Sequence, residues 1–379
     1  MQYNTNKEVF MLKKKIENVK FFQDGTLVFG DLYLEDGFVE RIDYKTPKME
    51  SDLALPGFVD IHTHGCMGIS ADTTDIQELL KLAMLYPKLG VTAFCPTLAS
   101  RSLKEYEPLI EAYRTAFRGS YKGARYMGLH LEGPYLNPDM NGAMNRKDIH
   151  PVNIGELDTF LGKYHEDIAI MTIAPEVENA QEAIRLLHLY GVEVSLGHTK
   201  ASYDEVMEAF DNGADQITHL GNTMPHVDHH KENMMDAIFL GDCLCEVIMD
   251  GIHVQPYMLK WMIPMIGSKR ITAISDSKFA GLDTHGVHPI DEHVSIINGA
   301  VYMDGELKRG CRDLLSTFTY LYKELHFDLM ECVDMCSLNA AKKLKTYAHE
   351  IGLGKKIDLV ILDHHLKLKE VVINGRSML

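Results

Sequence analysis

Short apolar runs alternate with amphipathic helical stretches from residue 58 to residue 274 of this 379-residue chain, and this alternation constrains the fold more than any other feature. The eight runs are Phe58–His62, Ala93–Cys95, Tyr126–Leu131, Ala169–Ile173, Val192–Leu196, Gln216–His219, Cys245–Met249 and Ile271–Ile274. The helix-period stretches between them include Asp75–Leu89, Leu103–Phe117, Asn179–Tyr190, Ser202–Asn212 and Tyr257–Ile266. Eight strand–helix units over roughly 270 residues predict an α/β fold of the (β/α)8, or TIM-type, barrel class.

The two ends of the chain carry a different pattern. Between Ile16 and Ala54, apolar or alternating segments are separated by Asp-Gly and Gly-Asp turns, which is typical of short antiparallel strands. Two more strand-like segments, Asp358–Leu362 and Glu370–Gly375, need neighbours, so we expect a small β-sandwich built from both chain ends. The predicted domain bounds are 1–55 and 346–379 for the small β domain and 56–345 for the barrel.

Composition narrows the class of function. The chain has 38 Lys and Arg against 54 Asp and Glu, a net charge of −16, which disfavours binding to nucleic acid or to an anionic membrane surface. No stretch approaches the roughly 18 apolar residues of a membrane span. Seven scattered cysteines favour reduced thiols in a cytoplasmic protein. We therefore expect an acidic cytoplasmic enzyme.

Candidate metal ligands follow the first predicted strand. It ends in His62-Thr63-His64, and alternate residues of a strand point to the same face, so both imidazoles can aim into the barrel mouth. His-x-His is a good half-site for a divalent transition metal. Two unrelated histidines are the alternative, and the position directly after a strand favours the metal.

Four more polar residues end later strands. They are Glu132 after the third, His198 after the fifth, His219 after the sixth and Asp276 after the eighth. A glutamate there needs a cation or a proton to offset its desolvation, and histidines on consecutive strands are typical of a second metal half-site. An aspartate could bind metal and move a proton to a leaving group. Each alone could be a satisfied core or surface residue, but barrels gather their functional groups at the carboxyl ends of strands.

Two further groups of residues have alternatives that stay open. The cysteine pairs Cys243/Cys245 and Cys332/Cys336 could bind a metal, but we favour their interpretation as buried thiols that pack in the core. A basic cluster follows the sixth strand and consists of His226, His229, His230 and Lys231. It is either a solvated loop or a subsite that binds an anionic group of the substrate.

The strand-end motifs, taken together, resemble those of the N-acetylglucosamine-6-phosphate deacetylases, a branch of the amidohydrolase superfamily. The segments that carry the resemblance are Pro56–Gly65, Gly90–Thr92, Pro96–Leu98, Gly128–Pro134, Ile173–Glu176, Gly197–Thr199, Thr218–Leu220 and Asp250–His253. The His-Leu-Glu-Gly-Pro motif at residues 130–134 is specific to this branch. Many amidohydrolases bridge two metals with a carboxylated lysine, whereas this branch uses the glutamate of the third strand.

The resemblance implies a ligand set and a base. The ligands of the better-occupied metal would be Glu132, His198 and His219, and a second site bridged by Glu132 would be completed by His62 and His64. The cofactor would be one or two divalent ions, zinc foremost, with iron, manganese, cobalt or nickel as alternatives. Asp276 matches the family's catalytic aspartate, which takes a proton from the attacking water and returns it to the departing sugar amine.

The substrate-binding residues that the resemblance implies are Ala143, Asn222, Thr223, His230, His253 and Leu307. Three positions depart from the family pattern. Met144 replaces a histidine that orients the substrate carbonyl, His230 with Lys231 replaces a phosphate-pairing arginine, and Lys308-Arg309 replaces small residues of a loop that lines the sugar pocket. In relatives that arginine and the equivalent of His253 reach the phosphate from the neighbouring subunit, which implies a homodimer.

The expected activity is metal-dependent removal of the acetyl group of N-acetylglucosamine 6-phosphate, giving glucosamine 6-phosphate and acetate. The nearest alternative is the same chemistry on N-acetylgalactosamine 6-phosphate or an unphosphorylated N-acyl compound, because a histidine lacks the bidentate fork of arginine. Ring deamination or opening of a cyclic amide is disfavoured by the Glu-Gly-Pro motif. A non-catalytic sugar-phosphate sensor would not need a full ligand set with its base.

Overall fold

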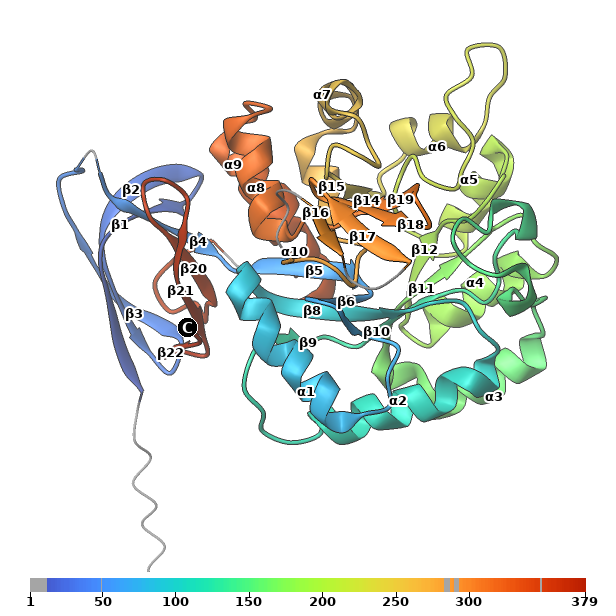
Figure 1. The fold of residues 1–379 in the computed structure, drawn as a ribbon, viewed down its shortest axis with the longest axis horizontal. Coiled ribbons are helices and arrows are strands. Elements are labelled where there is room, and N and C mark those ends of the chain that lie inside the picture. The colour runs from blue at the N-terminus through green and yellow to red at the C-terminus, as the bar shows by residue number, and fades with distance from the viewer. Residues whose placement is uncertain (1–11, 49, 283–286, 290–292, 348–349) are drawn as a thin grey trace, which may run out of the picture.

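The structure is a computed structural model that describes residues 12–48, 50–282, 287–289, 293–347 and 350–379. It has two bodies, a barrel of strands covered by helices and, beside it, a sheet that contains strands from both ends of the chain (Figure 1). Within the described residues, none of the helices has both the length and the apolar character needed to cross a membrane. All seven cysteines are described, and each is buried and outside any disulfide.

Eight parallel strands form the barrel in the order of the sequence. They are β5 (Phe58–Thr63), β8 (Val91–Leu98), β10 (Leu129–Glu132), β11 (Ile168–Ile173), β12 (Glu193–Leu196), β13 (Gln216–Ile217), β14 (Leu244–Ile248) and β15 (Ile271–Ile274). A short strand, β9 (Arg125–Tyr126), pairs with β8. The first and last strands meet where the amide of Asp276 donates to the carbonyl of His62 at 3.0 Å. Each predicted apolar run overlaps one of these strands, which confirms the barrel.

Helices cover the outside of the barrel (Figure 1). They are α1 (Ile76–Leu85), α2 (Leu103–Phe117), α3 (Ile154–Tyr164), α4 (Ala180–Leu189), α5 (Tyr203–Asp211), α6 (Met234–Leu240), α7 (Pro256–Ile266), α8 (Leu314–Lys323), α9 (Leu329–Val333) and α10 (Asn339–Leu344). Their boundaries follow local chemistry, as at α5, where Ser202 and Glu205 cap each other's backbone amides. The five predicted helical stretches all correspond to helices.

The chain-end sheet has seven strands in the order β22-β21-β20-β4-β1-β2-β3. The strands are β1 (Lys13–Gln23), β2 (Thr26–Glu35), β3 (Phe38–Tyr44), β4 (Asp52–Pro56), β20 (Leu359–Leu362), β21 (Leu368–Ile373) and β22 (Arg376–Ser377). The sheet curls, and its core combines residues of both chain ends, such as Val19, Leu32 and Leu359 (Figure 1). The two layers expected of a sandwich are therefore halves of one continuous sheet.

The chain-end sheet packs on the barrel through apolar residues such as Phe22, Leu53 and Val371, and two further contacts fix the junction. Only Gly57 separates β4 from β5, and a Cβ there would lie 2.0 Å from the Thr92 hydroxyl, so no larger residue fits. Arg125 of β9 makes two hydrogen bonds, of 2.7 and 3.0 Å, to the buried carboxylate of Asp358 just before β20. These contacts fix the direction in which the chain passes from β4 of the chain-end sheet into β5 of the barrel.

A second, four-stranded antiparallel sheet is inserted between β15 and α8, and the sequence pattern did not predict it. Its strands are β16 (Val287–Pro289), β17 (Val294–Ile297), β18 (Ala300–Met303) and β19 (Glu306–Gly310). Gly310 at its end lies against the turn after β14, where a Cβ would come within 1.7 Å of an Asp250 carboxylate oxygen. A small hairpin, β6 (Gly65–Cys66) and β7 (Ile69–Ser70), follows the first barrel strand.

Candidate functional site

Six of the candidate residues meet at the carboxyl end of the barrel. They stand at the ends of five different strands, His62 in β5 with His64 just after it, Glu132 as the last residue of β10, and His198, His219 and Asp276 two residues beyond β12, β13 and β15. Strand ends of a closed barrel converge on one opening, which explains why positions far apart in the sequence lie together.

The backbone bends sharply at three of these residues. His198, His219 and Asp276 have φ angles of 49°, 32° and 42°, in the left-handed region that side chains with a Cβ rarely adopt. Each such conformation costs roughly 1–2 kcal/mol. The surrounding barrel holds the three residues there, as is common where side chains must be aimed at a functional site.

Glu132 is the centre of the cluster. Its Oε1 lies 3.0 Å from the Nε2 atoms of both His198 and His219, and these two nitrogens are 3.1 Å apart. The Nε2 atoms of His62 and His64 lie 3.6 and 3.4 Å from its two carboxylate oxygens. Four imidazole nitrogens therefore face a single buried carboxylate.

Asp276 completes the arrangement from the last strand. Its Oδ1 lies 3.1 Å from the Nε2 of His64 and 3.5 Å from that of His62. It is thus close to the same two Nε2 atoms, of His62 and His64, that Glu132 faces. A second carboxylate beside the same nitrogens increases the negative potential of the cluster.

Hydrogen bonds on the far side of three imidazole rings set their tautomers. The Nδ1 atoms of His62, His64 and His198 lie 2.9, 3.1 and 2.8 Å from the Glu246 carboxylate and from the carbonyls of Thr97 and Met140. These oxygens accept, so each Nδ1 carries the hydrogen and each neutral ring presents an Nε2 lone pair to the cluster. In the described part of the chain, the buried Nε2 of His62 has no hydrogen-bond partner.

These donors fit a divalent cation. Three groups have ligand atoms within 4.8 Å of one another: His62 with His64 and Glu132, Glu132 with His198 and His219, and His62 with His130 and Glu246. The first two share Glu132. Burial lowers the pKa of His64, but the carboxylates of Asp276 and Glu132 outweigh it and raise that pKa to about 9. The cluster therefore attracts positive charge, which a proton or a metal ion can supply, and nitrogen–oxygen donor sets of this kind suit zinc and its neighbours.

Glu246 in β14 is a residue that the sequence analysis missed. It is fully buried, and its carboxylate accepts hydrogen bonds from His62 Nδ1 at 2.9 Å and Gln216 Nε2 at 2.7 Å. Its position orients His62, which in turn faces Glu132. The sequence feature that indicates Glu246 is a charged residue inside the apolar run Cys245–Met249. A search limited to residues at strand ends does not find it.

His130 lies close to Glu246 but has a different environment. Its Nδ1 lies 3.0 Å from the Ile61 carbonyl and its Nε2 lies 2.8 Å from the Thr172 hydroxyl. Burial lowers its pKa to about 4, so the ring is neutral and both of its nitrogens are already hydrogen-bonded. It supports the strands beneath the cluster and has no nitrogen left for a ligand.

Three of the candidate substrate residues lie beside the metal-ligand candidates. The loop with Ala143 covers His198, since a Cβ on the preceding glycine would lie 3.4 Å from that imidazole. The Asn222 amide donates to the carbonyl of His219 at 3.2 Å, and Thr223 follows it in the same turn. These segments border the opening above the cluster.

The other three candidates have different surroundings. His230 is exposed, and its described contacts are with Asp228 and the His229 ring, so none of these contacts joins it to the metal-ligand candidates. His253 is half-buried beyond β14, with Nδ1 2.6 Å from an Asp250 oxygen. Leu307 belongs to β19 through its backbone, and its side chain lies outside the described residues.

Comparison with known proteins gives the class to which this architecture belongs. The amidohydrolase family matches residues 53–378, and the chain belongs to this family. It is 28% identical over 365 residues to an N-acetylgalactosamine-6-phosphate deacetylase of Escherichia coli O157:H7, covering 93% of this chain and 96% of that one. It is 27% identical to the N-acetylglucosamine-6-phosphate deacetylase of Bacillus subtilis (strain 168), covering 91% and 92%.

Solved structures are similar over nearly the whole chain. The N-acetylglucosamine-6-phosphate deacetylase of Thermotoga maritima superposes with a TM-score of 0.83 at 25% identity, covering 97% of this chain and 99% of that one. The corresponding enzyme of Mycobacterium smegmatis has a TM-score of 0.85 at 24% identity and shows the same fold. The barrel and the chain-end sheet are thus shared features of these proteins.

Proposed function

We propose that this protein is a metal-dependent deacetylase of N-acetylglucosamine 6-phosphate that yields glucosamine 6-phosphate and acetate. The observation that carries the proposal is the convergence of four imidazole Nε2 atoms on Glu132, with Asp276 beside them. The names of several curated relatives, among them those of Lysinibacillus sphaericus and Bacillus subtilis (strain 168), support the same reaction. The proposed protein is a cytoplasmic homodimer, with residues 56–345 as the catalytic barrel and residues 1–55 and 346–379 as the small domain.

The proposed cofactor is one or two divalent ions. Glu132, His198 and His219 would hold one ion, and His62 and His64 would hold a second with Glu132 shared between them. Such an ion supplies Lewis-acid polarisation of an acyl carbonyl and lowers the pKa of water. Zinc matches the nitrogen and oxygen donors best, with iron, manganese, cobalt or nickel as alternatives.

Asp276 is the proposed general base and general acid. Its carboxylate takes one proton from the attacking water while the remaining hydroxyl adds to the acetyl carbon. It then delivers that proton to the amide nitrogen as the C–N bond breaks, so that acetate and a sugar amine leave. The segments with Ala143, Asn222 and Thr223 would orient the sugar, because they border the same opening.

A second candidate substrate is N-acetylgalactosamine 6-phosphate. The relative from Escherichia coli O157:H7 that carries this name is as similar to the chain as those named for the glucose epimer. The two sugars differ in the orientation of one hydroxyl, and the chemistry at the acetamide is the same. The choice between them therefore concerns the sugar pocket and leaves the ligand set and the base unchanged.

The test is acetate release from N-acetylglucosamine 6-phosphate, N-acetylgalactosamine 6-phosphate and unphosphorylated N-acetylglucosamine, each with zinc, manganese or iron. We expect the highest kcat/KM for the glucose 6-phosphate, and loss of activity after treatment with a chelator. A preference for the galactose epimer would establish the second candidate. No acetate from any of the three with metal bound would contradict both.

A further inference from the structure

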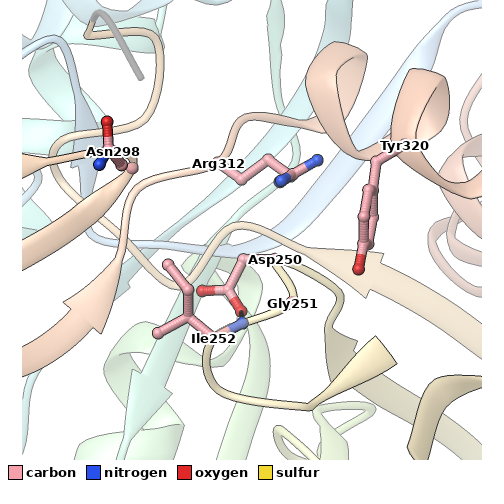
Figure 2. Close-up of a pocket in the computed structure, with 7 residues that line it drawn as sticks. Asp250, Gly251, Ile252, Asn298, Arg312 and Tyr320 are labelled. Carbon is pink, nitrogen blue, oxygen red and sulfur yellow. Dashed lines mark hydrogen bonds between the residues drawn. The ribbon is translucent and has the colours of Figure 1, made fainter. Parts of the chain in front are cut away.

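The segments that follow the barrel strands are arranged in two different ways. A cavity of about 350 Å³ separates the turn after β14 from segments that follow β15, and its lining includes Asp250, Asn298, Arg312 and Tyr320 (Figure 2). The segments after β10, β11 and β12, three consecutive strands, are instead joined by the side chain of one residue, Glu176. It stands three residues beyond β11 and was not among the candidate site residues.

The carboxylate of Glu176 accepts three hydrogen bonds from two neighbouring segments. Its Oε1 accepts from the side-chain amide of Asn137 at 2.8 Å and from the backbone amide of Lys200 at 2.6 Å. Its Oε2 accepts from the hydroxyl of Thr199. Hydrogen bonds to a carboxylate are roughly twice as strong as those between neutral groups, and they depend on direction. The half-buried Glu176 therefore fixes the two segments relative to each other.

These two segments frame His198. One of them begins directly after this residue, whose φ angle of 49° lies in the left-handed region. In the other, the backbone amide of Asn137 donates to the His198 carbonyl at 2.9 Å, and the carbonyl of Met140 lies 2.8 Å from the His198 Nδ1. Glu176 thus supports both the backbone of His198 and the segment that provides the acceptor for its ring.

The side chain of Asn137 connects Glu176 to that acceptor. Its Nδ2 donates to Glu176, which leaves its Oδ1 to accept from the amide of Asp139 at 2.9 Å. This second contact caps the short 3₁₀ turn Pro138–Met140. Because the turn ends at Met140, the position of the Met140 carbonyl depends on how the Asn137 side chain is oriented.

The same two segments share one other side-chain contact. The Nζ of Lys200 lies 2.9 Å from an Asp139 carboxylate oxygen, and both side chains are about half exposed. Solvent screens an exposed ion pair of this kind, so it contributes little to holding the segments together. The contacts of Glu176 are therefore expected to dominate.

We propose that Glu176 is a positioning residue for the candidate metal site and acts through His198 on the ion that this imidazole would share with Glu132. The inference rests on the proposed function and adds a residue that lies outside the set of ligands. Glu246 orients His62 by direct contact with its ring. Glu176 acts one step further away, because it holds the segments that hold the His198 ring.

The test measures the zinc affinity of the metal-free protein by competition with a chromophoric chelator. We expect E176A to lower this affinity about 10-fold, the lower end of the range for loss of a partner that orients a metal ligand. E176Q should lower it by a smaller factor, because glutamine has one accepting oxygen where glutamate has two. E178A removes an exposed carboxylate two residues further along, and this matched control should leave the affinity unchanged.

A second set of measurements uses the H62A/H64A protein, which retains the group of ligand candidates that contains His198. A role through His198 predicts that E176A lowers the zinc affinity by the same factor in this protein. A merely structural role predicts a lower unfolding temperature of the metal-free protein with no change in zinc affinity. Thermal unfolding of the metal-free variants is therefore measured beside each titration.

Equal zinc affinity of E176A and E178A would overturn the inference. If E176A does not fold, equal affinity of E176Q and E178A would overturn it. No substrate is present in these titrations, so wild-type protein that binds zinc but releases no acetate would overturn the deacetylase, and the zinc affinities would still decide the role of Glu176. Wild-type protein that binds neither zinc, manganese nor iron would overturn both.

Discussion

Two buried carboxylates, one in each body of the molecule, have opposite kinds of neighbour. Asp31 in the chain-end sheet lies 2.5 Å from the ammonium of Lys45 and 3.2 Å from that of Lys15, and it accepts from the amide of Asn18 at 2.9 Å. Glu132 in the barrel is faced by imidazole nitrogens and has no lysine or arginine partner among the described residues. Both carboxylates are almost fully buried, with exposed fractions of 2% and 3%.

This difference indicates that the charge of Asp31 has a structural role and that the charge of Glu132 has a functional one. Lysines are charged at neutral pH, so the charge of Asp31 is balanced within the chain. Burial alone would raise the pKa of Asp31, but the Lys45 ammonium and the Asn18 amide lower it to about 2. An ordinary imidazole is neutral near pH 7, so the charge of Glu132 is balanced only when the rings around it hold an added proton, as the raised pKa of His64 allows, or when a cation binds.

The largest effect should come from removing the charge of Glu132. We expect Glu132→Gln to abolish metal binding and to lower acetate release to the level of chelator-treated wild type. The metal-free variant should be no less stable than metal-free wild type, because a buried charge has been removed. Metal content and thermal unfolding with and without chelator measure both effects. Stoichiometric metal in the variant would contradict the conclusion that the charge of Glu132 is balanced by a bound cation.

Asp276→Asn should separate proton transfer from metal binding. We expect turnover to fall by at least about a hundredfold, the lower range for loss of a general base, while metal content stays unchanged. The amide keeps the shape of the side chain and removes the group that takes the proton. Steady-state kinetics and metal analysis on the same preparation check this, and an active variant would exclude Asp276 as the base.

Glu246→Gln should weaken metal binding selectively. The amide no longer holds the Nδ1 hydrogen of His62 as a carboxylate does, and loss of such a partner costs about 10- to 100-fold in metal affinity. We expect the His62–His64 side to lose its ion first while the other ion remains, as seen in a metal titration. Glu193→Gln, at a carboxylate of β12 that pairs with Lys343, is the matched control. Equal loss at both sites would argue against this orienting role.

The smallest effect on function should come from Asp31→Asn. We expect the free energy of unfolding at pH 7 to fall by about 1–3 kcal/mol, with metal content and turnover unchanged. In wild type, the pKa of Asp31 is about 2 when folded against an ordinary value of 3.8, so its stabilisation is present above roughly pH 4 and is lost as the pH falls toward 2. Denaturation curves of both proteins between pH 7 and pH 2 measure this, and a change in metal content would contradict it.

Much of the fold could be predicted because its signals are local. Each barrel strand is a short apolar run that the chain repeats with helices between, and the helix at residues 103–117 has the same bounds in sequence and structure. The four-stranded sheet at residues 287–310 was not predicted, although Asn298-Gly299 and Asp304-Gly305 are hairpin turn signals on either side of the apolar run Ala300–Met303. The chain-end sheet was foreseen, but its continuity depends on pairing between distant residues.

The site was predictable to the extent that it follows strand ends. His62, Glu132 and His219 could be assigned together because parallel strands in a barrel bring their carboxyl ends to one opening. Glu246 could not be found by that rule, since it lies inside its strand and acts through a neighbour's ring.

The order of strands in the chain-end sheet has a consequence for how the protein is made. Strand β4 pairs on one side with β1 and on the other with β20, which is synthesised roughly 300 residues later. At about 5–20 residues per second, the ribosome needs about 15–60 seconds to provide this partner. During that time the edge of β4 offers unpaired amides and carbonyls to any other strand, which makes this edge of the nascent chain prone to non-native pairing until the last segment emerges.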